Sequence, residues 1–292
     1  MIWNLGSINA DHFYRVPHLP GPGETLAATS FSKGLGGKGA NMSVACARAA
    51  GRVSHLGAVG EDGRWAITRL LECGVETQHI AVVEGPIGHA SIHVDPKGEI
   101  NIVLFPGANH AITEQMIGAA LTEASAGDVL LMQNETIGQV FAAQTAKTLG
   151  LRVVYAAAPF SADAVMALLG QIDLLVLNAV EAAQLLEGTG QALEDLPIDA
   201  IVVTLGSKGC KWVSNRAKST QSFEAYEVDA VDTTGAGDTF TGFLVASLDR
   251  GFDMAASLDL AMRAGALMVT RAGTADVIPD LKDIQDHDFR KG

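Results

Sequence analysis

The chain has 292 residues and a formal net charge of −13, with 48% hydrophobic and only 18% charged residues. This composition is typical of a soluble globular protein, and the negative charge argues against nucleic acid and anionic membranes as partners, because both bind basic surfaces. The first residues lack the basic and apolar segments of a signal peptide, and no stretch approaches the ~20 apolar residues of a membrane span, so we expect a cytoplasmic protein.

Short apolar runs alternate with helical segments along most of the chain. Strands are expected at residues 2–6, 54–60, 128–133, 152–157, 173–178 and 199–206. One helix is expected to follow the glycine cluster at 34–39 and to end at Gly51, and another covers 63–74 and ends at Gly74. Continuous apolar strands joined by helices indicate an α/β fold, a mostly parallel sheet with helices on both faces. We expect a single three-layer α/β/α domain over 1–292.

Two segments depart from this alternation. Residues 12–33 contain prolines and glycines that separate short extended pieces. Residues 87–105 alternate apolar and polar side chains on both sides of Asp95-Pro96-Lys97-Gly98, which predicts a β-hairpin. We expect the two segments to form a small β lid beside the main sheet.

Polar residues follow several of the predicted strands. They are Asn9 and Asp11, then Asn134 and Glu135, then Asn178, and finally the turn at 206–209. In open parallel sheets, ligands bind at the carboxyl ends of the strands. We therefore expect these residues to converge on one ligand site.

The stretch DTTGAGDTF, residues 232–240, combines a glycine turn with the start of a helix. Gly235 and Gly237 allow unusual backbone conformations, and the free N–H groups of such a turn suit an anion. Asp238 has two interpretations at this point. It either caps the helix, since Asp is a preferred N-cap residue, or acts as the base that takes a proton from an attacking hydroxyl in phosphoryl transfer.

The glycine cluster GLGGKG, residues 34–39, matches the spacing of a dinucleotide-binding fingerprint, with Glu61 and Asp62 about twenty residues later. This favours an alternative class, an NAD-dependent oxidoreductase. Against it, some twenty-five residues separate the cluster from the first strand, whereas the fingerprint belongs in the first tight strand-to-helix turn. In the other interpretation, the turn brings backbone amides, Lys38 and Asn41 to the hydroxyls of a polyol.

Two further motifs are open to structural and functional interpretations. Asn178 and Glu181 have the spacing of a capping box, and they could also contact a phosphate and water-bound Mg²⁺. The segment TLGSKG at 204–209 is either an ordinary hairpin or part of a nucleotide site. Asp232 is either a buried cap or a cation ligand.

Taken together, GSINAD (6–11), GGKGAN (36–41), LLMQNE (130–135), NAVE, TLGSKG and DTTGAGDTF resemble the ribokinase family of carbohydrate kinases, of the PfkB type, over essentially the whole chain. The resemblance implies an ATP-dependent kinase that phosphorylates the primary hydroxyl of a pentose, with D-ribose as the first candidate. It also implies Mg²⁺ and a monovalent cation, K⁺, as cofactors, and a homodimer formed through the lid.

The resemblance assigns roles to individual residues. Asp238 would be the base, and Gly235, Ala236 and Gly237 would form the anion hole. The sugar ligands would be Asn9, Asp11, Gly37, Lys38, Asn41 and Glu135. ATP and Mg²⁺ would be bound by Asn178, Glu181, Thr204, Gly206 and Gly209. The monovalent cation would be bound by Asp232, Thr234, Met268, Arg271 and Gly273, mostly through backbone carbonyls.

Three positions depart from the family pattern, which usually has an Asn at Ala156, a hydroxyl residue at Val277 and a His at Ala261. Other functions stay open beside the first candidate. One is a related kinase for another sugar or nucleoside, because a few pocket residues can redirect specificity. Another is a non-catalytic sugar-binding protein, which would keep the sugar residues and lose the base.

Overall fold

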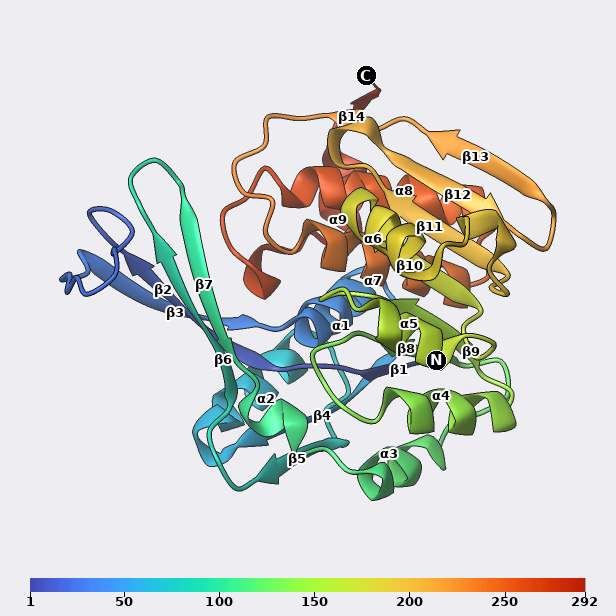
Figure 1. The fold of residues 1–292 in the computed structure, drawn as a ribbon, viewed down its shortest axis with the longest axis horizontal. Coiled ribbons are helices and arrows are strands. Elements are labelled where there is room, and N and C mark those ends of the chain that lie inside the picture. The colour runs from blue at the N-terminus through green and yellow to red at the C-terminus, as the bar shows by residue number, and fades with distance from the viewer. Residues whose placement is uncertain (292) are drawn as a thin grey trace.

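A nine-stranded sheet forms the centre of the molecule in the computed structural model, which describes residues 1–291 (Figure 1). Its strands, in spatial order, are β13 (Ser219–Phe223), β12 (Cys210–Ser214), β11 (Ala200–Thr204), β10 (Leu174–Asn178), β9 (Arg152–Ala156), β8 (Val129–Met132), β1 (Ile2–Leu5), β4 (Val53–Gly60) and β5 (Ile80–Val83). Only β12 and β13 at one edge are antiparallel to their neighbours. The predicted mostly parallel sheet is thus confirmed.

Helices cover both faces of this sheet (Figure 1). One face carries α1 (Lys38–Arg48), α2 (Arg64–Glu72), α7 (Ala236–Asp249), α8 (Met254–Met268) and α9 (Leu281–Asp286); the other carries α3 (Glu114–Leu121), α4 (Gln139–Thr148), α5 (Ala162–Leu168) and α6 (Ala179–Thr189). Successive residues of a strand point to opposite faces. Accordingly, Ile2 of β1 lies in the core of the first face and Trp3 in that of the second. The three-layer α/β/α prediction is confirmed.

A second sheet of four strands, the lid, projects from one side of the molecule (Figure 1). Its order is β3 (Ser30–Gly36), β2 (Asn9–Arg15), β6 (Gly88–Val94) and β7 (Ile100–Phe105). The hairpin predicted over 87–105 is present as β6 and β7. Its turn is fixed by Asp95, whose Oδ1 accepts hydrogen bonds from the backbone N–H groups of Lys97 and Glu99. A short pair, β14 (Tyr226–Glu227) and β15 (Arg290–Lys291), lies elsewhere.

The glycine cluster does not form a single turn. Residues 34–36 are the end of lid strand β3, and the chain turns at Gly37, with φ of 92°, before α1 begins at Lys38. The expected helix end at Gly51 is also too late: the C-cap of α1 is Ala49, and Ala50 takes the left-handed conformation that often follows a helix. Gly51 is needed for packing instead: a Cβ there would lie 2.9 Å from the Cβ of Ala246 on α7.

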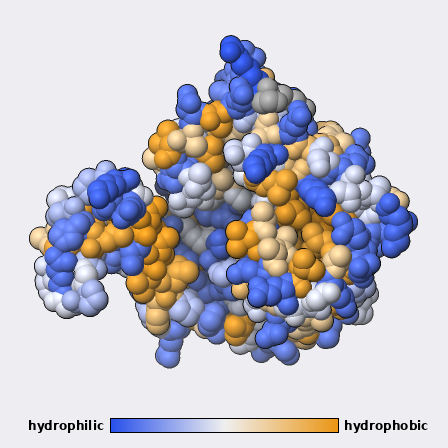
Figure 2. All heavy atoms as spheres, turned by 45° about the horizontal axis from the view of Figure 1, so that its top comes forward, coloured by the Kyte–Doolittle hydropathy of each residue, from blue (hydrophilic) through white to orange (hydrophobic). Residues whose placement is uncertain are grey.

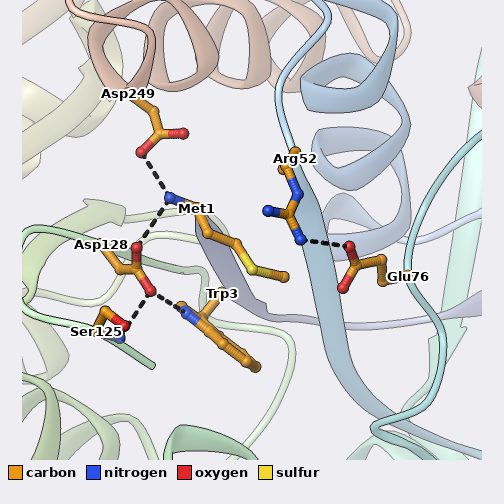
Figure 3. Close-up of polar contacts among 7 residues, drawn as sticks. All are labelled: Met1, Trp3, Arg52, Glu76, Ser125, Asp128 and Asp249. Atoms are coloured by element: carbon orange, nitrogen blue, oxygen red, sulfur yellow. Dashed lines mark hydrogen bonds and ion pairs between the residues drawn. The ribbon is translucent and has the colours of Figure 1, made fainter. Parts of the chain in front are cut away.

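The start of β1 is held by a group of polar contacts (Figure 3). The amino group of Met1 lies between Asp128 and Asp249, at 3.0 and 3.1 Å. Asp128, just before β8, also accepts hydrogen bonds from the indole of Trp3 and the backbone of Ser125. These bonds join β1 to the loop before β8 and to the end of α7. No helix within residues 1–291 is long and apolar enough to cross a membrane.

Candidate active site

The base of the lid and the start of α7 border the same region, at the carboxyl ends of the parallel strands. Figure 2 shows the lid standing across a hollow from the main body, with apolar side chains on its inner side. The polar residues that follow β1 and β8 lie here, together with the first residues of α1 and α7. The predicted convergence therefore occurs for Asp11 and Glu135, whose charges interact, whereas the side chain of Asn134 bonds Pro159 and Tyr155.

Asp238 does not cap α7. The N-cap is Gly235, with φ of 72°, and no side chain among residues 1–291 makes a cap hydrogen bond to α7. The Asp238 carboxylate is 7% exposed and accepts its hydrogen bond from Asn41 on α1, with Nδ2 and Oδ2 2.9 Å apart. The helix-cap interpretation is wrong for this residue. Its carboxylate is instead held beside the helix start, where the free N–H groups favour an anion.

Four carboxylates, those of Asp11, Glu135, Glu181 and Asp238, interact with one another or with the ammonium group of Lys38 in this region. Burial, together with the nearby charges of Glu135 and Asp238, raises the pKa of Asp11 to about 7. Burial also raises the pKa of Asp238, although Lys38 and Asn41 oppose the shift. Asp238 in turn raises the pKa of Lys38. The site can therefore hold a carboxyl group that gains or loses a proton near neutral pH.

Glu135 is held rigidly at the end of β8. Its Oε2 accepts hydrogen bonds from the hydroxyl of Ser7 at 2.5 Å and from the backbone N–H of Lys38 at 2.9 Å. Ser7 also accepts a hydrogen bond from the backbone N–H of Gly39. Ser7 was not among the predicted site residues, although it lies inside the GSINAD motif.

Asn9 and Asp11 lie on the first residues of lid strand β2, both less than a tenth exposed. Asp11 packs against strand β3 so closely that a Cβ on Gly36 would lie 2.0 Å from its Oδ2. Asn9 pairs with Asn109, a residue that the sequence motifs did not single out. Both predicted sugar ligands therefore belong to the base of the lid.

A buried chain of hydrogen bonds runs beneath the turn that carries Lys38. Asn4 donates to the hydroxyl of Ser43, which bonds Nδ1 of His55, and Nε2 of His55 bonds the carbonyl of Gly6. Because a carbonyl only accepts, Nε2 carries the proton and Nδ1 accepts from Ser43. Burial lowers the pKa of His55 to about 4. The ring is therefore neutral at physiological pH and fixes the strand end that bears Ser7.

A cavity of about 660 Å³ lies on the other side of the α7 start. Its lining includes Thr204, Gly206, Gly209, Ala236 and Gly237. Phe240 and three residues of α8 supply apolar walls. A largely apolar cavity beside a helix N-terminus suits a nucleotide, with the base in the apolar part and the phosphates at the helix.

Asn178 and Glu181 form the predicted capping box at the start of α6. Asn178 Oδ1 accepts from the N–H of Glu181, and Glu181 Oε2 accepts from the N–H of Asn178. Neither residue lines the 660 Å³ cavity. Burial raises the pKa of Glu181, and Lys38 lies near enough to oppose that shift. The structural interpretation is confirmed, and one carboxylate oxygen is left for other contacts.

The predicted cation ligands also lie together. Asp232 accepts backbone hydrogen bonds from Thr234 at 2.9 Å and from Gly273 at 3.2 Å. Although burial opposes it, these bonds lower the pKa of Asp232. The guanidinium of Arg271 is bound to Val277 and Asp283, which leaves only its carbonyl for a cation. Within residues 1–291, no group of three His, Cys, Asp or Glu side chains could hold a metal ion.

The dinucleotide-binding alternative is wrong. Its fingerprint requires a glycine turn directly between a strand of the main sheet and a helix. Here Gly34 and Gly36 belong to lid strand β3, where they pair with Asp11 and Asn9 of β2. The absence of a side chain at Gly36 serves the close approach of the Asp11 carboxylate rather than of a pyrophosphate.

Comparisons with known proteins agree with this geometry. Residues 1–281 match the family model of pfkB family carbohydrate kinases. The chain is 37% identical to the ribokinase of Haemophilus influenzae over 295 residues, 94% of each chain. It is similar to the crystal structure of Thermotoga maritima ribokinase, with a TM-score of 0.88, 29% identity and 98% of each chain covered. Arabidopsis thaliana ribokinase, solved with ribose and ATP, matches with a TM-score of 0.84, 27% identity and 97% of each chain covered.

Proposed function

This chain belongs to the pfkB family of carbohydrate kinases, and from that premise we propose that it phosphorylates the primary hydroxyl of D-ribose with ATP, giving ribose 5-phosphate. The observation that carries the proposal is the carboxylate of Asp238. It is buried, accepts no cap bond, and lies at the start of α7 between the sugar-side residues and the 660 Å³ cavity.

In the proposed reaction, Asp238 takes the proton of the attacking hydroxyl. Burial raises the pKa of this carboxyl, which makes it a stronger base once ionised. The backbone N–H groups of Gly235, Ala236 and Gly237 stabilise negative charge on the transferring phosphoryl group. Lys38, whose charge couples to that of Asp238, helps to keep this base ionised.

The sugar side of the site consists of hydrogen-bonding groups. Asn9, Asp11, Asn41 and Glu135 offer amide and carboxylate groups to the hydroxyls, together with the turn at Gly37 and Lys38. Asn41 carries a further signal, because its Oδ1 is buried and has no hydrogen-bond partner within residues 1–291. A buried polar atom without a partner costs free energy, which a substrate hydroxyl would recover.

The nucleotide occupies the 660 Å³ cavity, with Thr204, Gly206 and Gly209 along its wall. Asn178 and Glu181 lie near the phosphate end. The free oxygen of Glu181 fits a water-bound Mg²⁺, because this cation keeps several waters when it binds phosphates. When bound, Mg²⁺ neutralises charge on the phosphates.

We also propose a K⁺ site at the loops of Asp232, Thr234, Met268, Arg271 and Gly273. Carbonyl and carboxylate oxygens are the ligands that such a cation takes, and the hydrogen bonds of Asp232 hold the two loops side by side. The proximity of this site to the α7 start gives the cation a route to affect phosphoryl transfer.

A homodimer through the lid is part of the proposal. Strand β7 exposes Ile102, Val103 and Leu104, each more than half accessible, which is unusual for a monomer surface. Sedimentation should give twice the chain mass, and Ile102→Asp should shift it to a monomer.

A cytoplasmic location is proposed as well, since Cys46, Cys73 and Cys210 are all free.

The test of the main proposal is an ADP-release assay with ATP and a panel of sugars and nucleosides. D-ribose should give the highest kcat/KM, and the product should carry phosphate on its primary hydroxyl. Highest activity with another sugar or a nucleoside would favour the related-kinase alternative. Binding of sugar without any ADP release would favour a non-catalytic sugar-binding protein.

A further inference from the structure

The base of the lid contains a pair of buried amides, Asn9 and Asn109, of which only Asn9 has an assigned role. Asn109 lies in the 3₁₀ helix η2 (Gly107–His110), directly after lid strand β7. Its Nδ2 donates to Oδ1 of Asn9 at 2.7 Å, and its Oδ1 accepts from the backbone N–H of Ile8 at 2.8 Å. Asn109 is 2% exposed and Asn9 is 5% exposed.

These contacts fix the orientation of both amides. A backbone N–H can only donate, so the atom of Asn109 that faces Ile8 must be the oxygen. The NH₂ group of Asn109 therefore faces Asn9 and requires an acceptor there, which assigns Oδ1 of Asn9 to that contact. The Nδ2 of Asn9 then points away, and it has no hydrogen-bond partner within residues 1–291.

Asn109 also occupies the junction of the lid with the main body. The backbone N–H of Ala108 donates to the carbonyl of Pro86, just before β6. The backbone N–H of Asn109 donates to the carbonyl of Pro106. The pair is closely packed from the side of β6: a Cβ on Gly88 would lie 2.1 Å from Nδ2 of Asn109 and 2.5 Å from Oδ1 of Asn9. The hydrogen bond between Asn109 and Asn9 therefore depends on how the β6–β7 hairpin is attached to the main body.

We propose that Asn109 is a positioning residue for the sugar, which holds the amide of Asn9 so that its NH₂ group donates to a substrate hydroxyl. This inference rests on the proposed function, in which Asn9 binds the sugar. The sugar thereby meets a donor at Asn9 and an acceptor at Asp11, two residues along the same strand. Asn109 itself does not touch the substrate.

Asn109→Asp is the variant of choice, because it keeps the acceptor for Ile8 and loses the donor to Asn9. The amide of Asn9 then turns to donate to the new carboxylate and no longer presents its NH₂ group to the sugar. The KM for the sugar should rise by ~10-fold, the loss of one hydrogen bond, while kcat and the KM for ATP change by less than about twofold. Gly88→Ala, which separates the same two amides, should reproduce this pattern.

A double-mutant cycle separates positioning from general damage or from the added charge. In an Asn9→Ala background, Asn109→Asp should change the sugar KM by less than about twofold. Asn215→Asp is the matched control, since Asn215 donates two hydrogen bonds to the carbonyls of Leu193 and Leu196, far from the lid. Sugar affinity measured by calorimetry without ATP gives the same comparison independently of turnover.

An unchanged sugar affinity in Asn109→Asp, or an equal loss in the Asn9→Ala background, would overturn the inference. If Asn109→Asp does not fold, Gly88→Ala is the deciding variant. An unchanged KM for the sugar in Gly88→Ala would then contradict the positioning role of Asn109. The proposed function fails separately, if the unmodified protein phosphorylates no sugar.

Discussion

Asn41 and Asp238, 197 residues apart in the chain, are joined by a 2.9 Å hydrogen bond between Nδ2 and Oδ2. The bond links the first turn of α1, which follows lid strand β3, to the first turn of α7, which borders the 660 Å³ cavity. It directs the carboxylate of Asp238 away from its own helix backbone. The carboxylate therefore takes no part in capping α7, which is the geometry that the proposed base requires.

Asp238→Asn should separate catalysis from stability. The amide keeps the shape of the side chain and loses the base, so kcat should fall by at least ~10²-fold while the melting temperature stays the same or rises, because a buried charge is removed. Asp253→Ala is the matched control. Asp253 is a true N-cap of α8, which accepts from Ala256, so this variant should lose about 1 kcal/mol of stability and keep its activity. The reverse pattern would restore the cap interpretation of Asp238.

Gly36→Ala should damage the sugar site alone. The new Cβ would lie 2.0 Å from Oδ2 of Asp11, so this carboxylate must move. The KM for the sugar should rise by ~10-fold or more, with the KM for ATP unchanged. Gly118→Ala on α3, whose Cβ would meet Phe141 at an ordinary 3.7 Å, is the control and should leave both constants unchanged. Equal damage to ATP binding would show that Asp11 does not belong to the sugar site alone.

Sugar binding should strengthen as the pH rises. Burial raises the pKa of Asp11 to about 7, so the carboxyl is neutral below that pH and ionised above it. The ionised form accepts stronger hydrogen bonds from hydroxyl groups. Calorimetry between about pH 6 and 8 should therefore show a rising affinity in the unmodified protein and a weak, flat profile in Asp11→Asn. A flat profile in both proteins would contradict the assignment of Asp11.

His55 should make the protein sensitive to mild acid. Burial lowers its pKa to about 4 in the folded state, below the ~6.5 of an unfolded chain. Between these values the unfolded state binds more protons, so stability falls as the pH drops through the window, by up to about 3 kcal/mol. Chemical denaturation of His55→Gln should show a smaller loss over this range, and the exposed His18→Gln should behave like the unmodified protein. An identical pH dependence in His55→Gln would refute the role of this ring.

Asp232→Asn should weaken the proposed K⁺ site. The amide can accept only one of the two backbone hydrogen bonds that Asp232 accepts from Thr234 and Gly273, and it lacks the charge that attracts a cation. The K⁺ concentration for half-maximal activity should rise by ~10-fold, measured at constant ionic strength. If K⁺ has no effect on the unmodified protein, the cation assignment is wrong, whereas the kinase proposal stands.

The sheet, its helices and the lid hairpin could be predicted because their signals are local. Apolar runs, glycine stops and the alternation around Asp95 each depend on a few neighbouring residues. The region of Asp238 was also identifiable, because glycines that leave backbone N–H groups free stand beside a carboxylate within one short stretch. The prediction of a single glycine turn over 34–39 was wrong. The residue types in this cluster do not show that strand β3 ends at Gly36 and that the chain turns at Gly37.

The supporting residues of the site could not be predicted in this way. Asn109 acts on Asn9 across 100 residues, and the hydroxyl of Thr274 bonds the carbonyl of Leu35 across 239. Neither residue has a periodic or motif context, because its role is created by the packing of the lid on the body. His55 is similar, a single polar residue within an apolar strand whose partners come from other elements.

The most direct test of the account is a coupled ADP-release assay of the unmodified protein with ATP, Mg²⁺ and D-ribose, followed by analysis of the sugar product. We predict ADP release that depends on ribose, with the phosphate on the primary hydroxyl and with activity largely lost in Asp238→Asn. Absence of ADP release with every sugar and nucleoside from a folded protein, or full activity in Asp238→Asn, would contradict the central claim.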